Sequence, residues 1–235
     1  MNLLAFDTST ERMSVAVQIL RDGHSRCWQH EGEGGAQTSA HLIPNIEALM
    51  TQAGLVFAQL DAIVFGCGPG SFTGLRTACA VAQGLAWGAA VPVLPVDTLL
   101  ALAEQARFDH DPEAPNCRVL ALLDARMDEI YVGGYAFKQG VWHQTRAPAL
   151  VRPEQVPTDV GSLLAGHVPD AYVARLPAGA GRPALALPTA RALLRLAPTQ
   201  LAAGGARPAE QALPIYVRDQ VAKTTLERAA EKAVL

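Results

Sequence analysis

The chain has 235 residues, a formal net charge of −3, 50% hydrophobic residues and 17% charged residues. This length and balance are ordinary for a folded protein with one large core or two smaller ones, and they argue against a largely disordered chain. Binding nucleic acid alone requires a basic face that neutralises phosphates, so the acidic balance excludes that role unless a partner supplies the contacts.

The four cysteines form no Cys-x-x-Cys pair, and Asp7 interrupts the opening apolar run that a secretory signal would need. We therefore expect a reducing, cytoplasmic location and no membrane partner. The uncharged run at 77–96 approaches the length of a membrane span, but two prolines and two glycines divide it into a helix followed by a strand.

Apolar periodicity and turn residues predict the elements of the first half. The helix at 38–53 has Thr38 or Ser39 as its expected N-cap and Gly54 as its stop. The other elements expected here are strands at 3–7 and 13–17 joined by a hairpin turn, a strand at 25–30, a buried strand at 62–65, a helix at 73–90 and a strand at 91–96.

A charged, proline-containing segment at 109–115 predicts a boundary, which we place between subdomains 1–106 and 107–235. Beyond it the pattern of the first half returns: an apolar strand, an aspartate, a turn and another strand. This weak duplication is typical of actin-like ATPases and sugar kinases. The later elements expected are strands at 118–123, 129–137, 141–150 and 213–217 and a helix at 189–196. We expect the final helix to pack back on the first subdomain. The region at 156–190 is hard to interpret, and no element is assigned to it.

The most distinctive motif is the glycine-rich loop at 66–76, which reads GCGPGSFTGLR. A nucleotide P-loop ends in Gly-Lys followed by Ser or Thr, but here Leu75 and Arg76 follow Gly74. The dinucleotide fingerprint fails as well, because its third glycine is replaced by Ser71 or Thr73. We interpret the loop as a tight strand-to-helix turn, with Ser71 as N-cap, whose glycines allow a partner's helix rather than a phosphate to approach.

Two aspartates, Asp7 and Asp124, end the equivalent strands of the two halves. One hypothesis is an ATP site in which they flank the phosphates; the other is that each caps a strand-to-turn transition. The bulky residues after Asp124 favour capping, because a phosphate-binding hairpin needs glycines. We therefore assign a weak or vestigial nucleotide site to Asp7, Thr8, Ser9 and Asp124 and predict no cofactor.

No catalytic or metal-binding residue is predicted. None of the six histidines pairs with another at helical spacing, and no Gly-x-Ser-x-Gly elbow is present. His41, at the start of a helix, is the best functional candidate among them.

The helix at 75–90 carries Arg76 as its only charge, and the helix at 38–53 carries only Glu47 on its outward side. Such helices indicate a partner surface, since contiguous exposed apolar patches mark interaction sites, unless other parts of the chain cover them. One face of the later helix can pack on the sheet through Leu75, Cys79, Ala82, Leu85 and Ala86. The opposite face is small, with Thr77, Val81, Gly84 and Gly88.

The motifs at 3–9, 38–44, 66–76, 123–126 and 214–218 together resemble the TsaB (YeaZ) family, and the Ser-Phe-Thr-Gly-Leu-Arg stretch is specific to it. The resemblance implies an α/β fold of two actin-like (ASKHA, RNase H-like) subdomains and a role in making threonylcarbamoyladenosine beside the tRNA anticodon. It also implies a catalytic paralogue, TsaD, as partner and TsaE as an associated ATPase, with tRNA contacted through the complex and a homodimer in isolation.

The paralogue's two metal-binding histidines would follow the strand at 91–96, where this chain has Asp97-Thr98-Leu99. We therefore expect a non-catalytic scaffold subunit. The alternatives are a stand-alone metallopeptidase or ATPase of the same superfamily and a truncated sugar kinase, which the short length disfavours. The expected partner contacts are His41, Leu42, Asn45, Ala48, Gly70, Phe72, Thr73, Arg76, Thr77, Val81, Gly84 and Gly88.

Overall fold

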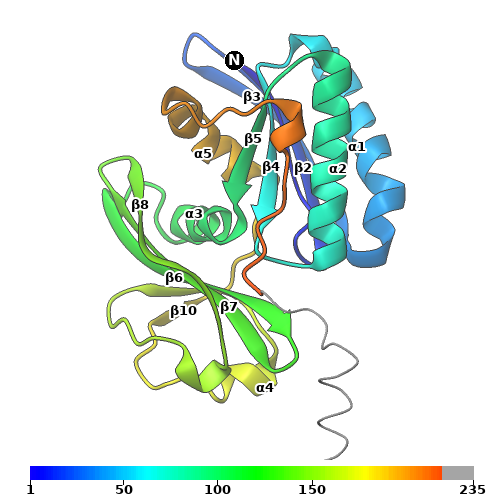
Figure 1. Cartoon of the computed structure of the whole chain (residues 1–235). Helices are drawn as coiled ribbons and strands as arrows, with labels where there is room; N and C mark the ends of the chain where they lie inside the picture. Colours follow the sequence, from blue (N-terminus) through cyan, green and yellow to red (C-terminus); the bar gives the residue numbers. More distant parts are fainter. Residues whose placement is uncertain (219–235) are drawn as a thin grey trace, which may run out of the picture.

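The computed structural model describes residues 1–218, which form two five-stranded mixed sheets with helices (Figure 1). The first sheet has the order β3-β2-β1-β4-β5, in which β1 runs antiparallel to β2 and parallel to β4. Its strands are β1 (Asn2–Asp7), β2 (Arg12–Arg21), β3 (His24–Glu33), β4 (Ala62–Gly68) and β5 (Val93–Asp97).

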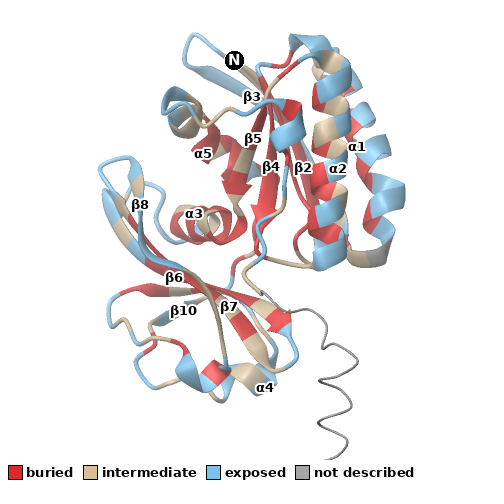
Figure 2. Cartoon of the chain, viewed as in Figure 1, coloured by how far each residue is buried: buried red, intermediate tan, exposed pale blue. Residues whose placement is uncertain are grey.

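Helices cover both faces of the first sheet. On one face α1 (Thr38–Ala53) and α2 (Phe72–Ala89) bury apolar side chains against β1, β2 and β4. On the other face lie α3 (Thr98–His110) and α5 (Ala190–Ala202), which returns to the first sheet after the chain has built the second. The inner strands are consequently buried, whereas the outward sides of α1 and α2 are exposed (Figure 2).

The second sheet repeats this arrangement in the order β10-β9-β6-β7-β8, with β6 antiparallel to β7 and parallel to β9. Helix α3 packs on one of its faces, and the short α4 (Asp170–Val173) contributes to the other. Its strands are β6 (Asn116–Arg126), β7 (Glu129–Lys138), β8 (Val141–Val151), β9 (Leu163–His167) and β10 (Arg182–Ala184). The 3₁₀ turns are η1 (Gly35–Gln37), η2 (Phe57–Gln59), η3 (Pro153–Gln155) and η4 (Ala209–Gln211).

Glu104 on α3 ties the two halves together. Its carboxylate is buried and accepts hydrogen bonds from Arg107 Nε at 3.0 Å, Arg195 Nε at 2.6 Å and Trp142 Nε1 at 3.0 Å, so α3, α5 and β8 meet at one group. Burial alone would raise the pKa of Glu104, but these donors outweigh it and lower that pKa.

Several expectations from the sequence need correction. Helix α3 was not predicted, and it runs across the proposed boundary at 106/107. Helix α1 begins after Gln37 with no side-chain cap, so neither Thr38 nor Ser39 is its N-cap. The unassigned region 156–190 contains β9, α4 and β10. No strand forms at 213–217; this extended segment makes one backbone bond to β4, from Ile215 N–H to the carbonyl of Cys67 at 2.7 Å.

Candidate functional site

The glycines of the loop between β4 and α2 are packed against other parts of this chain. A Cβ atom on Gly74 would lie 1.8 Å from the carbonyl oxygen of Thr8, and one on Gly70 would lie 2.6 Å from that of Ser9. A Cβ on Gly68 would lie 2.6 Å from the carbonyl oxygen of Ile215. The expectation that a partner helix approaches these glycines is therefore wrong for the loop, and Gly70 is filled internally.

The residues assigned to a vestigial nucleotide site at the end of β1 are already hydrogen-bonded. Asp7 is fully buried, and its Oδ1 accepts bonds from the backbone N–H of Ser9 at 2.9 Å and from its hydroxyl at 2.6 Å. The Thr8 hydroxyl donates to the carbonyl of Gly74 at 2.7 Å, and Ser71 N–H donates to the carbonyl of Ser9 at 2.7 Å. This geometry favours the capping hypothesis over an open phosphate site.

Burial also shifts the pKa of Asp7. Among the described residues its Oδ2 has no hydrogen-bond partner, and burial raises its pKa from 3.8 to about 6 although the two Ser9 bonds oppose the shift. A Cβ on Gly66 would lie 1.9 Å from this Oδ2, so the glycine provides the space for the carboxyl group. Asp7 is thus an enclosed structural acid rather than a group facing a ligand.

Asp124 also caps its own turn. Its Oδ1 accepts a bond from Arg126 N–H at 2.8 Å, and its Oδ2 pairs with the Arg126 guanidinium at 3.1 Å. Arg126 also pairs with Glu11, so the turn after β6 is linked to the turn after β1.

These two turns border a cleft of about 1010 Å³ between the subdomains. Ser9, Gly70, Ser71 and Asp124 line it, but Asp7 and Thr8 do not. Its charged walls are mixed rather than basic, which does not favour a polyphosphate ligand. The charged lining residues are Glu11, Glu31, Asp109, Asp124, Arg12, Arg126 and Arg218, with His167 nearby in the same wall.

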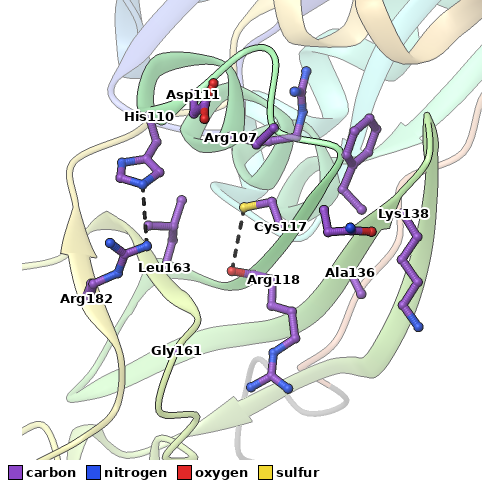
Figure 3. Close-up of a pocket in the computed structure, with 13 residues that line it drawn as sticks. Arg107, His110, Asp111, Cys117, Arg118, Ala136, Lys138, Gly161, Leu163 and Arg182 are labelled. Atoms are coloured by element: carbon purple, nitrogen blue, oxygen red, sulfur yellow. Dashed lines mark hydrogen bonds between the residues drawn. The ribbon is translucent and has the colours of Figure 1, made fainter.

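A second hollow of about 430 Å³ lies where the end of α3 meets the second sheet (Figure 3). Arg182 approaches His110 Nε2 at 3.4 Å there, and Cys117 Sγ points toward the carbonyl of Arg118. Although basic side chains line it, Arg107 is paired with Glu104 and Arg118 with Asp159, and Asp111 stands in the wall. It is therefore not a strongly cationic site.

Within residues 1–218, no group of three or more His, Cys, Asp or Glu side chains is placed to hold a metal ion. In the same range, no helix is long and apolar enough to cross a membrane. The predicted division of 77–96 into a helix and a strand is confirmed, because α2 ends at Ala89 and β5 begins at Val93.

The outward sides of α1 and α2 form the second candidate site, which we call the α1/α2 face. Between them the helices have two formal charges, Glu47 and Arg76. On α2 the exposed residues follow one stripe along the helix, and neither Gly84 nor Gly88 has an atom within 4 Å of the position a Cβ would take. The stripe consists of Phe72, Thr73, Arg76, Ala80, Gly84, Trp87 and Gly88.

The structure places ten of the twelve expected partner contacts on this face and corrects a second one besides Gly70. Leu42 is fully buried in the core beneath α1 and is not available to a partner. The exposed ones are His41, Ala48, Phe72, Thr73, Arg76, Gly84 and Gly88, and the half-buried ones are Asn45, Thr77 and Val81. Two large residues of the face were missed, Trp87 at 72% exposure and Ile43 at 43%. Their outward position in the helical repeat is the signal that could have found them.

Two sheets of matching mixed topology, joined through a shared helix and bordering one cleft, define the actin-like class of α/β proteins. Comparisons with known proteins agree. The model of the family "TsaD: tRNA N6-adenosine threonylcarbamoyltransferase" matches residues 33–161. The structure of YeaZ from Pseudomonas aeruginosa superposes with a TM-score of 0.79 at 39% identity, covering 92% of this chain and 99% of that one.

The chain belongs to the TsaB (YeaZ) family. It is 32% identical over 231 residues to the Escherichia coli tRNA threonylcarbamoyladenosine biosynthesis protein TsaB, covering 94% of this chain and 96% of that protein. The Haemophilus influenzae protein of the same name is 43% identical over 132 residues, covering 56% of this chain and 52% of that protein. The family is thus one involved in threonylcarbamoyladenosine biosynthesis, as the resemblance of the motifs implied.

Proposed function

We propose that this chain is a non-catalytic scaffold subunit that docks on a TsaD-type transferase and activates it to make threonylcarbamoyladenosine in tRNA. The observation that carries the proposal is the α1/α2 face. A solvent-facing helix normally carries charged side chains, whereas this face presents glycines, alanines and the exposed ring of Trp87. Burying such a surface against a partner removes apolar area from water and leaves few charges to desolvate.

The two open glycines support a protein partner of similar fold. Because no side chain stands at Gly84 and Gly88, the backbone of another helix can approach α2 closely there. A TsaD-type subunit belongs to the same family model and would bring equivalent helices. In the free state a second copy of this chain would cover the face instead, and the partner complex, with a TsaE-type ATPase, would supply the tRNA contacts in the cytoplasm.

The internal bonding at the end of β1 supports a role without catalysis. A catalytic actin-like ATPase would present its first-turn groups to phosphates, but here the Ser9 N–H and the Thr8 hydroxyl are committed to Asp7 and Gly74. The carboxyl of Asp7 is enclosed away from the cleft. No observation in residues 1–218 favours the metallopeptidase or ATPase alternative.

The test is co-purification with a TsaD-type subunit. Gly84→Arg should abolish the complex, because the new side chain is charged, lies in the middle of the face and occupies open space in the monomer. It is a cleaner variant than Val81→Arg, since Val81 is half-buried against the core. Val160→Arg, at a position 83% exposed on the second subdomain, is the matched control.

The same variants should differ in their activity in a reconstituted tRNA modification assay. Wild type and Val160→Arg should restore modification, and Gly84→Arg should not. A circular dichroism melt confirms that each variant is folded. Undiminished complex formation by folded Gly84→Arg would refute the proposed docking face.

A further inference from the structure

A strip of exposed apolar side chains continues from the α1/α2 face toward the second subdomain. It begins at Phe72, the first residue of α2, follows the extended segment after η4 and ends at the turn between β6 and β7. We call these residues the strap strip: Phe72, Leu213, Ile215, Tyr216 and Met127. Leu213 is 62% exposed and Met127 is 78% exposed. A single exposed apolar residue needs no explanation, but several that follow one path mark an interaction site.

The strip is joined directly to the α1/α2 face. The rings of Phe72 and Tyr216 have centroids 5.5 Å apart, and the Arg76 guanidinium lies over the Phe72 ring at 3.7 Å. Arg76 Nε also donates a hydrogen bond to the Tyr216 hydroxyl at 3.1 Å. Phe72 and Arg76 belong to the exposed stripe of α2. The extended segment after η4 therefore lies beside the first turn of that stripe (Figure 1).

The other end of the strip is a strained turn. Arg126, Met127 and Asp128 have φ of 60°, 56° and 64°, three consecutive non-glycine residues in the left-handed region, where L residues are disfavoured. Glycine or asparagine would relieve this strain, so the side chains retained there require explanation.

Contacts within the chain explain two of the three residues. Arg126 pairs with Glu11, and Asp128 pairs with Arg175 while its N–H donates to the Tyr172 hydroxyl at 3.0 Å. Met127 stands at the tip with 78% of its surface exposed, and its sulfur accepts a hydrogen bond from Arg218 Nη1 at 3.0 Å. Internal packing therefore does not account for an apolar side chain at that position.

We propose that the strap strip is a second part of the partner surface, so that one TsaD-type subunit contacts both subdomains of this chain. The inference rests on the proposed function, because its occupant is the subunit that covers the α1/α2 face. Continuity with that face identifies the occupant: a partner seated on Phe72 and Arg76 meets Tyr216 within the same aromatic stack. The chemistry fits a largely apolar protein surface, since Arg76 and Arg218 are engaged with Tyr216 and Glu129, and the charges that flank Met127 at the turn, Arg126 and Asp128, are paired with Glu11 and Arg175.

The strip is also held in place before a partner arrives. Ile215 N–H bonds to β4, Tyr216 is fixed by the stack with Phe72, and Arg218 donates to the carbonyl of Ala125 at 3.2 Å and pairs with Glu129. A surface fixed at three points loses little conformational entropy on binding, which favours its use as an interface.

The experiment measures the dissociation constant between the full-length chain and a TsaD-type subunit by titration calorimetry. Met127→Asp and Leu213→Asp should each weaken binding by about tenfold or more, because each places a carboxylate in an apolar contact. Aspartate tolerates the left-handed region, so the first variant leaves the turn intact. Val160→Asp, at a valine that is 83% exposed and outside the strip, should stay within about twofold of wild type.

Gly84→Arg separates the two proposals. If it abolishes binding while Met127→Asp and Leu213→Asp bind like wild type, the strap strip is not an interface and the α1/α2 face stands. If Gly84→Arg also binds like wild type, the proposed function is refuted, and the strap-strip proposal is refuted too because it names the same partner. Melting curves within a few degrees of wild type establish that weaker binding by the aspartate variants is not unfolding.

Discussion

Alanine substitutions at two glycines of α2 should change stability in opposite directions. Gly74 and Gly84 look alike in the sequence, but a Cβ on Gly74 would lie 1.8 Å from the backbone oxygen of Thr8, whereas a Cβ on Gly84 would meet nothing within 4 Å. A carbon and an oxygen 1.8 Å apart are closer than their ordinary contact distance by more than about 1 Å. The obstacle is backbone at the end of a buried strand, so it cannot rotate away as a side chain could.

We expect Gly74→Ala to lower the free energy of unfolding by about 3 kcal/mol, the upper range for overpacking in a core. Gly84→Ala should raise it by about 1 kcal/mol, because alanine is the better helix former and loses nothing by contact. Urea denaturation followed by circular dichroism measures both at one pH. If Gly74→Ala unfolds at the same urea concentration as wild type, the close packing of α2 on the β1–β2 turn is refuted.

Three further outcomes follow from buried or paired charges. Asp7→Asn should raise the free energy of unfolding at pH 7 by roughly 3 kcal/mol, since the pKa is raised to about 6 by burial and the folded wild type bears an unfavourable charge above that pH. Wild type should therefore gain stability as the pH falls from 7 to 4, and the variant should lack this gain in denaturation curves at several pH values; parallel curves would contradict it. Glu104→Ala should cost about 4 kcal/mol in urea denaturation, because it strands two guanidinium groups at a buried site, and a loss below about 1 kcal/mol would contradict that. Arg126→Ala should cost less than about 1 kcal/mol by the same assay, since Arg126 and Glu11 are 67% and 73% exposed; a larger loss would mean that the Arg126 pairs with Glu11 and Asp124 contribute more than exposed ion pairs do.

Most elements were predictable because local signals and tertiary packing agree. The helix at 38–53 has the predicted bounds, and Gly54 ends it in the left-handed conformation at φ 67°. Ser71 caps α2 as predicted, by accepting a bond from Gly74 N–H. Strands β6, β7 and β8 follow their apolar patterns to within a few residues.

The missed elements lack a strong local signal. Helix α3 is buried between two sheets, so apolar residues occupy most of its sides and no amphipathic stripe marks it, although Asp97 caps its first turn by accepting a bond from Leu99 N–H at 2.8 Å. Strands β9 and β10 are short and exist because they pair with β6 and with each other. The apolar segment at 213–217 resembles a strand, but it bonds to β4 at one point instead of forming a ladder.

The exposed, weakly charged side of α1 and α2 was predictable, but the burial of each residue on it was not. Leu42 shares a helical repeat with the buried Ile46 and Leu49, and that phase places it in the core rather than beside His41. The sequence cannot distinguish a glycine filled by its own chain from an open one, because the filling atoms at Gly70 come from a turn far away in the chain. That distinction depends on the fold.

The glycines of the loop at 66–76 and those later in α2 therefore serve different purposes. The first group leaves room for atoms of Asp7, Ser9 and Ile215. This close packing fixes the start of α2 against the β1–β2 turn and against the strap strip. The second group leaves open space on the outward stripe. Because the start of α2 is fixed on both sides, the open stripe is held in one orientation, and a helix that enters there meets a surface already formed. In the proposed interface, rigidity at Gly74 and openness at Gly84 are two complementary requirements, since a docking helix that shifted on its sheet would lose the alignment between the α1/α2 face and the strap strip.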